Sequence, residues 1–387
     1  MSEMSNSRSI ELPTDLSEVM DENARKLDAH DKDPQPAISN NPFETHGPNK
    51  VIFAYLSSRF PTFVRLTAIR DKGWLSSKGD EHFQKQRATA IKPTAKVEKG
   101  FFNCMTQNGN ELQVVTGGFN ITRTSPPPER ILDLCMAPGA FLQVALTFNP
   151  SATAKAFTLP VESGGHATRI KSHTRFGGRV DLTYQDITLM AADMGVTTIP
   201  TSHPDAASLL TVRQIPAEEV FDLVICDGQV LRGHDRAEWR EQNEARRLVS
   251  TQLALGLEHL REGGTMIVLL HKIERWEVLK LLYHFHKFSD VSVFKPERIH
   301  ASRSSFYLVA KKVQSQSEAA RAVLQEWKKE WEVTTFGTAE EIEEVLKKDD
   351  EKVKEVLEEF ADKLGGLGEV VWGIQANALE TSKWMKK

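Results

Sequence analysis

The chain has 387 residues, of which 40% are hydrophobic and 26% charged, and its formal net charge is -4 at pH 7. A chain of this length can bury a substantial core, in one large domain or in two. The slight acidity excludes a globally basic nucleic-acid-binding protein, so any such surface must be local. The three cysteines are widely spaced, which argues against a disulfide framework or a zinc site and fits a reducing compartment.

The N-terminal segment, residues 1–48, is polar, acidic in patches and interrupted by prolines. It buries too little apolar surface to offset the entropy of ordering, so we expect a disordered tail. It lacks the pattern of a signal peptide, and no run approaches the roughly 20 apolar residues that cross a bilayer. We therefore expect an intracellular protein without membrane contacts, in the cytoplasm rather than the nucleus.

The remaining chain changes its pattern twice. Apolar residues three or four positions apart predict a helical N-terminal extension over 49–125. After the prolines at 126–128, short apolar strands alternate with helices over 126–312. A helical, charged C-terminal extension follows over 313–387, with a capping box at Thr338-Ala-Glu-Glu341 and an expected helix stop at Gly365-Gly366.

Seven apolar segments in the central region predict strands. Most are near-continuous apolar runs, which is typical of strands covered on both faces. Helical patterns lie between several of them, at 140–147, 238–261 and 276–288, and this alternation predicts a Rossmann-like, doubly wound, mostly parallel seven-stranded sheet. The predicted strands are 131–135, 154–159, 180–185, 221–226, 265–270, 291–294 and 306–310.

The turn after the first predicted strand has the composition of a ligand site. The strand ends at Asp133 and leads through Cys135-Met-Ala-Pro-Gly139 into a helix. Ligands of open α/β sheets bind beyond the carboxyl ends of the strands, where small residues let them approach the backbone. The chain has neither the G-x-G-x-x-G spacing here nor a G-x-x-x-x-G-K-[ST] loop elsewhere. A cofactor without phosphates, such as S-adenosylmethionine, is favoured over NAD or ATP.

Two further acids end strands at the same edge of the predicted sheet. Asp186 follows the third strand, where it either contacts an adenine edge or caps a helix. Asp227 ends the fourth strand, where it lies close to the reacting group of a ligand or caps a loop.

Four segments resemble, in content and in order, the motifs of FtsJ/RrmJ-like methyltransferases. The resemblance covers roughly Pro126 to Lys312, and the flanking helices look like those of fungal members. It implies S-adenosylmethionine-dependent 2'-O-methylation of RNA ribose, and hence an RNA substrate. The segments are Asp133-Leu-Cys-Met-Ala-Pro-Gly-Ala-Phe141, Asp222-Leu-Val-Ile-Cys-Asp-Gly228, Gly263-Gly-Thr-Met-Ile-Val268 and Arg303-Ser-Ser-Phe-Tyr-Leu-Val-Ala310.

The resemblance also implies roles for single residues. Gly139 and Phe141 match positions that line the cofactor site, Asp186 matches the adenine-side acid, and Asp227 matches the catalytic aspartate. The family's acid after the second strand is missing, so Thr158 or Glu162 would replace it. The predicted cofactor-binding residues are Asp133, Cys135, Ala137, Pro138, Gly139, Phe141, Thr158, Asp186 and Asp227.

The family's Lys-Asp-Lys-Glu tetrad is incomplete in this chain. Its central lysine resembles a base or orienting cation for the ribose hydroxyl. That position falls on Leu269, and the glutamate position falls on Ser305. Lys272, just beyond the fifth strand, is the predicted catalytic partner of Asp227; alternatively it is a surface lysine that pairs with Glu274. Candidates for the first lysine are Lys85 and Lys96.

Basic residues near the same edge form the predicted RNA surface, because phosphate neutralisation needs such clusters. Interspersed acids leave an ordinary solvated loop as the alternative. No metal site is expected. Two other functions stay open: a catalytically silent module that binds cofactor or RNA, and a methyltransferase for a non-RNA acceptor. The predicted RNA contacts are Lys295, Arg298 and Arg303, with His300 beside them and Arg232, Arg236 and Arg240 after Asp227.

Overall fold

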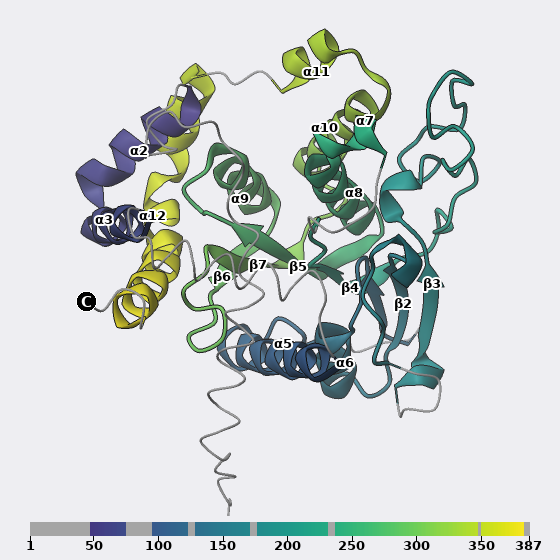
Figure 1. Ribbon diagram of the computed structural model, residues 1–387, viewed down its shortest axis with the longest axis horizontal. Coiled ribbons are helices and arrows are strands. Elements are labelled where there is room, and N and C mark those ends of the chain that lie inside the picture. Colours follow the sequence, from purple (N-terminus) through teal and green to yellow (C-terminus); the bar gives the residue numbers. More distant parts are fainter. Residues whose placement is uncertain are drawn as a thin grey trace, which may run out of the picture.

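A computed structural model describes residues 47–74, 95–122, 128–170, 176–230, 237–346 and 350–382. The predicted tail, apart from its last two residues, lies outside the described residues, as do Lys85, Arg232 and Arg236. The described residues build a layered α/β structure around one central sheet (Figure 1).

The sheet has seven strands in the order β3-β2-β1-β4-β5-β7-β6. Strands β1 to β5 are parallel, whereas β7 is antiparallel to both β5 and β6. This confirms the predicted Rossmann-like, mostly parallel sheet. The strand order reverses between β1 and β4, and ligands bind at the carboxyl ends of the strands at such a switch point. The strands are β1 Arg130–Asp133, β2 Thr153–Thr158, β3 Val180–Tyr184, β4 Phe221–Cys226, β5 Leu260–His271, β6 Asp290–Phe294 and β7 Ser305–Val313.

Helices cover both faces of the sheet (Figure 1). Helices α5 (Ala95–Thr116) and α6 (Ala140–Phe148) cover one face, and α8 (Glu244–Glu258), α9 (Trp276–Phe288) and α10 (Glu318–Phe336) cover the other. The bounds of α9 agree with the prediction. The helix predicted over 238–261 is instead divided into α7 (Glu238–Glu241) and α8, and its last residues belong to β5. Short 3-10 helices are η2 Val161–Ser163, η3 Gly177–Arg179 and η4 Ile187–Leu189.

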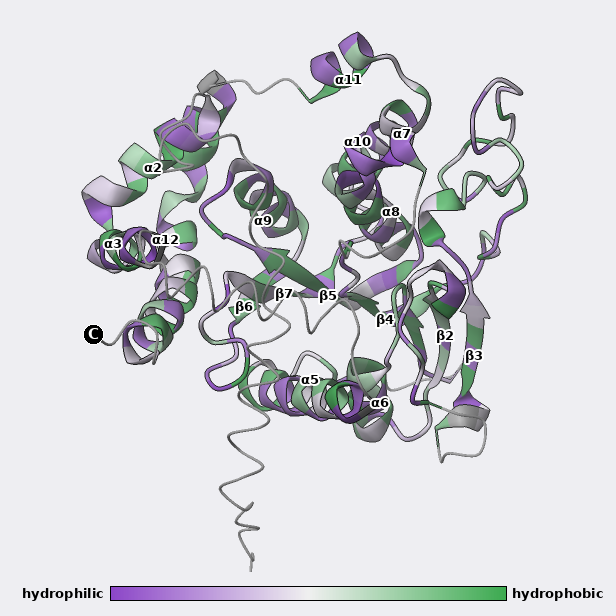
Figure 2. Ribbon diagram, in the orientation of Figure 1, coloured by the Kyte–Doolittle hydropathy of each residue, from purple (hydrophilic) through white to green (hydrophobic). Residues whose placement is uncertain are grey.

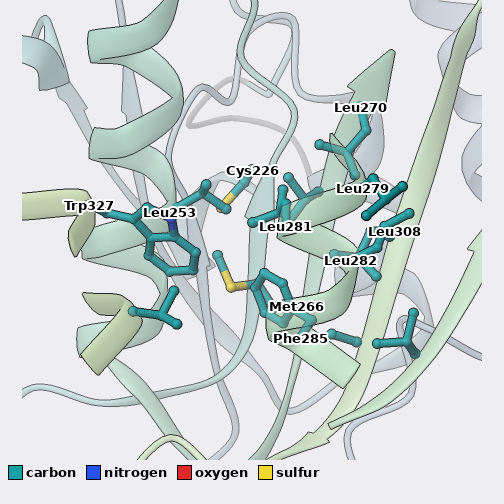
Figure 3. Packing of buried hydrophobic residues seen from close by; sticks show 14 of the residues in the cluster. Cys226, Leu253, Met266, Leu270, Leu279, Leu281, Leu282, Phe285, Leu308 and Trp327 are labelled. Carbon is teal, nitrogen blue, oxygen red and sulfur yellow. The ribbon is translucent and has the colours of Figure 1, made fainter. Parts of the chain in front are cut away.

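Apolar side chains fill the space between the sheet and these helices. Strand β4 is buried at every position, as its near-continuous apolar sequence predicts. Met266 of β5 and Leu308 of β7 lie in one cluster with Leu282 and Phe285 of α9 and Trp327 of α10 (Figure 3). The hydropathy colouring shows the same concentration of hydrophobic residues along the central strands (Figure 2). Burying each large side chain contributes about 1.5–3 kcal/mol.

Helices from the two ends of the chain form a bundle beside β6 (Figure 1). It consists of α2 (Pro48–Arg59), α3 (Pro61–Trp74) and α12 (Asp350–Thr381). The helix stop predicted at Gly365 is wrong, because α12 continues through it. A Cβ at Gly365 would lie 2.5 Å from the Phe60 ring, so this glycine allows close helix packing. The predicted capping box at Thr338 is confirmed at the start of α11 (Ala339–Val345).

The bundle is bonded to the loop that follows β5. Glu274 in this loop is only 1% exposed and accepts a hydrogen bond from Arg70 Nη1 at 2.6 Å. Trp372 Nε1 donates to its other oxygen at 3.3 Å. Burial alone would raise the pKa of Glu274, but the charge and hydrogen bond of Arg70 hold this pKa below its usual value. Both helical extensions therefore support a loop at the carboxyl end of the sheet. No helix of the described ranges is long and apolar enough to cross a membrane.

Candidate active site

The turn after β1 is tightly packed at Gly139, the N-cap of α6. Gly139 has a φ of 100°, a left-handed conformation that favours glycine. A Cβ at this position would lie 2.8 Å from Met136 Sδ and 3.0 Å from the Ile170 side chain. The carbonyl of Pro138 accepts a hydrogen bond from the Arg169 N–H at 3.0 Å, which fixes the turn against the loop after β2. Ala137 lies in the same turn.

The ends of β1 and β4 are in close contact. Asp133 accepts a hydrogen bond from the Cys135 N–H at 3.3 Å. A Cβ at Gly228, which directly follows Asp227, would lie 2.3 Å from Cys135 Sγ. The missing side chain of Gly228 thus lets the Cys135 thiol pack between the two strand ends, beside both carboxyl groups.

Asp133 and Asp227 form an acidic pair at the switch point. Asp133 is 1% exposed and Asp227 is half-buried. Burial raises the pKa of Asp227 to about 7, against a smaller opposite effect of a backbone hydrogen bond. Burial, followed by the charge of Asp227, raises the pKa of Asp133 well above its usual value. No ion pair of the described residues involves either acid. The pair therefore favours a cationic ligand.

Asp186 is the N-cap of η4, where its Oδ1 accepts from the Thr188 N–H at 3.0 Å. Its Oδ2 accepts from Arg240 Nη2 at 2.7 Å. Asp186 is therefore a helix cap, as one of the two interpretations predicts. A contact between Asp186 and adenine stays a prediction. Arg240 is 8% exposed and also pairs with Glu244, so the predicted RNA contact of Arg240 is wrong. A buried guanidinium between two carboxylates does not reach a phosphate.

The C-terminal helix α10 supports the loop that contains Asp186. Trp331 Nε1 donates to the carbonyl of Thr188 at 3.0 Å. The fully buried Arg247 donates to the same carbonyl at 3.0 Å and to Thr335 Oγ1 of α10 at 3.0 Å. The C-terminal extension thus fixes the loop of Asp186 at the edge of the candidate site.

Other predicted cofactor residues occupy the end of β2 and the start of α6. Thr158 ends β2 and is 4% exposed, while Glu162 is exposed in η2. Both lie at the carboxyl edge of the sheet, and their contact with a cofactor stays a prediction. Phe141 is 2% exposed, and its ring stacks on Tyr307 with centroids 4.9 Å apart. This ring supports the turn from the core side rather than facing a ligand.

Lys272 directly follows β5, which ends at His271. Lys272 has a φ of 55°, and its N–H donates to the Ser304 carbonyl at 3.1 Å. Its charge contributes to the lowered pKa of Glu274, after the larger effects of Arg70 and of a backbone hydrogen bond, which oppose the effect of burial. The structure thus brings Lys272 near the acid named in our alternative interpretation. Its catalytic role stays a prediction.

Two residues near Asp227 were missed in the sequence. His271 Nε2 lies 3.0 Å from Oε1 of Gln229, two residues after Asp227. Tyr307 is 3% exposed, and burial followed by the charge of Asp227 raises its pKa. Tyr307 pairs with Leu269 across β5 and β7. The two-residue period of a strand, counted from Leu269, would have revealed His271.

The predicted RNA contact of Lys295 is wrong. This lysine is 2% exposed, and its Nζ donates to the carbonyls of His300 at 2.8 Å, Arg303 at 2.5 Å and Ser305 at 2.8 Å. An ammonium group saturated in this way stabilises the loop before β7 and does not reach a phosphate. Arg298 is exposed and Arg303 half-buried, so Arg298 is the better placed of the remaining two.

Replacing Lys295 by methionine is expected to lower the free energy of unfolding by about 2–4 kcal/mol, because three carbonyls lose a charged donor. Urea unfolding measures this loss. Arg298→Met is the matched control on the same loop, with a change within about 0.5 kcal/mol. Unchanged stability of Lys295→Met together with weaker RNA binding would restore the original RNA prediction for Lys295.

The FtsJ-like methyltransferase family matches residues 113–313, just over half of the chain. The chain belongs to this family. No curated protein matches it. The match begins within α5, so this helix lies partly inside the methyltransferase region.

Solved methyltransferases resemble this FtsJ-like methyltransferase only distantly. An O-methyltransferase family protein from Burkholderia thailandensis has 14% identity and a TM-score of 0.31, over 68% of this chain and 71% of that one. An rRNA methylase from Streptococcus thermophilus has 14% identity and a TM-score of 0.29, over 48% and 87%. The N-methyltransferase NodS from Bradyrhizobium japonicum WM9 has 15% identity and a TM-score of 0.31, over 52% and 95%.

The residues at the switch point fit S-adenosylmethionine, the methyl donor of an FtsJ-like methyltransferase. Its sulfonium and ammonium charges match the acidic pair Asp133 and Asp227, which lies at the carboxyl ends of β1 and β4. When bound, this cofactor supplies a methyl group activated by a positively charged sulfur. The described ranges contain no cluster of three or more potential metal-ligating side chains.

Proposed function

We propose that this protein transfers a methyl group from S-adenosylmethionine to a 2'-hydroxyl of RNA ribose. The observation that carries the proposal is the position and environment of Asp227. It follows β4 at the switch point, and its pKa of about 7 keeps it between acid and base near neutral pH. A carboxylate so placed orients a hydroxyl toward an activated methyl group.

The protein's other contributions are binding and alignment. The turn at Gly139 and the acidic pair hold the cationic donor, and the loop of Asp186, fixed by α10, receives its other end. Because the donor is already activated, alignment in a site with little water supplies much of the rate. The exposed Arg298 offers a cation for a phosphate of the RNA.

A non-RNA acceptor is the second candidate. It is favoured by the burial of Lys295 and Arg240, which removes two cations from the predicted RNA surface. The net charge of -4 points the same way. A silent binding module is the third candidate, because Leu269 and Ser305 occupy tetrad positions.

The test combines calorimetric binding of S-adenosylmethionine with transfer of a tritiated methyl group to protein-free total RNA. We expect binding, and label that ribonuclease removes. Label in the protein or small-molecule fraction of an extract instead selects the second candidate. Binding without transfer selects the silent module, and absence of binding contradicts all three.

Gly139→Ala is expected to weaken cofactor binding at least tenfold, because its Cβ meets Met136 and Ile170 in a left-handed backbone conformation. Gly178→Ala is the matched control, since nothing lies within 4 Å of its added Cβ. Both affinities are measured by the same calorimetric titration. Equal affinities of the two variants would remove the turn from the cofactor site.

A further inference from the structure

His271 lies on the catalytic side of the sheet. It is the last residue of β5 and pairs with Ser305 of β7. Successive side chains of a strand point to opposite faces, and Ile267 and Leu269 belong to the core cluster beneath α5 and α6. His271, two residues further on, therefore lies on the face of Leu269, one step closer to the rim.

Gln229 connects His271 with the segment of Asp227. The His271 Nε2 and the Gln229 Oε1 are 3.0 Å apart. Gln229 follows Asp227 by two residues on the chain that leaves β4, and β4 pairs in parallel with β5 through Cys226 and Val268. His271 thus lies at the carboxyl end of β5, and Asp227 follows the carboxyl end of the neighbouring strand β4.

We propose that His271 is the proton acceptor of the methyl transfer, in place of the lysine that the family has at the position of Leu269. The proposal rests on the function proposed above. With Nε2–H donating to Gln229, the neutral imidazole carries its lone pair on Nδ1. The hydroxyl O–H bond breaks and its proton moves to Nδ1. The oxygen's electron pair forms the bond to the methyl carbon as the S–CH₃ bond breaks, leaving an uncharged thioether. The imidazolium that forms keeps its hydrogen bond to Gln229, two residues after Asp227.

Lys272 is less suited to this role. It lies beyond the end of β5 with a left-handed φ of 55°, and its charge acts on Glu274, which accepts hydrogen bonds from Arg70 and Trp372 of the helical bundle. An imidazole is the side chain whose ordinary pKa lies closest to neutral pH, which suits it to accept a proton there.

Within the ranges that the structure describes, charged and titratable groups near His271 come from the segment after β4, from β7 and from the loop before β7. Asp227 follows β4, and Tyr307 lies on β7. The loop before β7 contributes His300, whose pKa is lowered to about 3 by burial and then by Lys295 and His271. His300 thus stays neutral and does not compete for the proton. The other charged groups of that loop are Lys295 and Arg303, together with the exposed Glu297 and Arg298.

His271→Gln tests the assignment, because glutamine keeps a polar side chain beside Gln229 but accepts no proton. We expect turnover to fall about 10²–10⁴-fold, with cofactor affinity within threefold of wild type. The residual rate should rise with hydroxide concentration above pH 7 and recover partly with added imidazole. The matched control is His284→Gln, a half-buried histidine of α9, with wild-type turnover. Turnover of His271→Gln within threefold of wild type, or an equal loss in His284→Gln, would overturn the assignment.

A second measurement tests the state of His271 without any methyl acceptor. In the ¹⁵N spectrum of labelled histidine at pH 7.5, we expect His271 as the neutral Nε2–H tautomer, with Gln229→Leu altering that tautomer. An imidazolium or an Nδ1–H tautomer in the wild type would overturn the proposal. If the wild type labels a non-RNA acceptor, the RNA function fails, and His271→Gln must still abolish that labelling for the assignment to stand. Absence of any transfer by the wild type overturns both.

Discussion

Replacing Arg70 by methionine is expected to lower the free energy of unfolding by about 3–5 kcal/mol. Glu274 is 1% exposed, and Arg70 is the cation that lies 2.6 Å from its carboxylate. Without the guanidinium, the buried negative charge loses its largest stabilising partner and keeps a backbone hydrogen bond, the weaker effect of the Lys272 charge and the long hydrogen bond from Trp372 at 3.3 Å. Urea unfolding at pH 7.5 measures the loss.

Arg65→Met is the matched control on the same helix. Arg65 also pairs with a glutamate of α12, at 2.7 Å, but its side chain and that of Glu380 are 42% and 45% exposed. We expect a much smaller change, because water screens exposed ion pairs. The double variant Arg70→Met/Glu274→Met should regain most of the lost stability. Equal effects of Arg70→Met and Arg65→Met would contradict a buried charge pair.

The same ion pair predicts a pH dependence. The pKa of Glu274 is lower in the folded protein than in the unfolded chain, so its stabilising contribution is present above the unfolded pKa. The contribution is lost as the pH falls through the lower, folded pKa. The difference in stability between wild type and Arg70→Met should therefore narrow below about pH 4.

Asp227→Asn is expected to reduce methyl transfer about 10²–10⁴-fold and to stabilise the protein above pH 7. The folded pKa is about 7, against an ordinary value of 3.8. Between these values the folded protein retains a proton that the unfolded chain has released, so stability is lost as the pH rises toward 7. The neutral amide removes this loss. The gain should reach at most about 4 kcal/mol at pH 8 and vanish near pH 3.

Urea unfolding of the cofactor-free protein at pH 4, 6 and 8 checks the sign of this effect. Asp181→Asn is the matched control, because Asp181 lies on β3 with 72% of its side chain exposed. We expect wild-type turnover and no pH-dependent gain for that control. An Asp227→Asn variant that is less stable at pH 8 and keeps its turnover would contradict the role of Asp227.

The sheet could be predicted because its signals are local. Residues 221–226 and 276–288 carry the apolar patterns of a buried strand and an amphipathic helix, and both have the predicted bounds. The bundle of α2, α3 and α12 could not be predicted from the sequence, because it depends on contacts between segments that are far apart in the chain. Arg70 and Glu274 are 204 positions apart. Gly365 predicts a helix end by residue type, yet it faces the Phe60 ring in the middle of α12.

The candidate site likewise contains some residues whose position the sequence predicts and others whose position it does not. Gly139 and Asp227 follow strands whose position the sequence predicts, so their location at the switch point is confirmed. The RNA contact predicted for Lys295 is wrong because a sequence shows the charge of a lysine but not its burial. The three groups that accept hydrogen bonds from Lys295 are backbone carbonyls, which no residue type reveals. The family motif does not predict His271, because it places the lysine at Leu269, two residues earlier on the same face of β5.

The most direct test of ribose methylation identifies the modified atom. Wild-type protein is incubated with protein-free total RNA and S-adenosylmethionine that carries a deuterated methyl group, and the RNA is digested to nucleosides for mass spectrometry. We predict the deuterated methyl on the ribose fragment, present with wild type and absent with Asp227→Asn. Label on the base fragment, or no labelled nucleoside from a protein that binds the cofactor, would contradict the proposal.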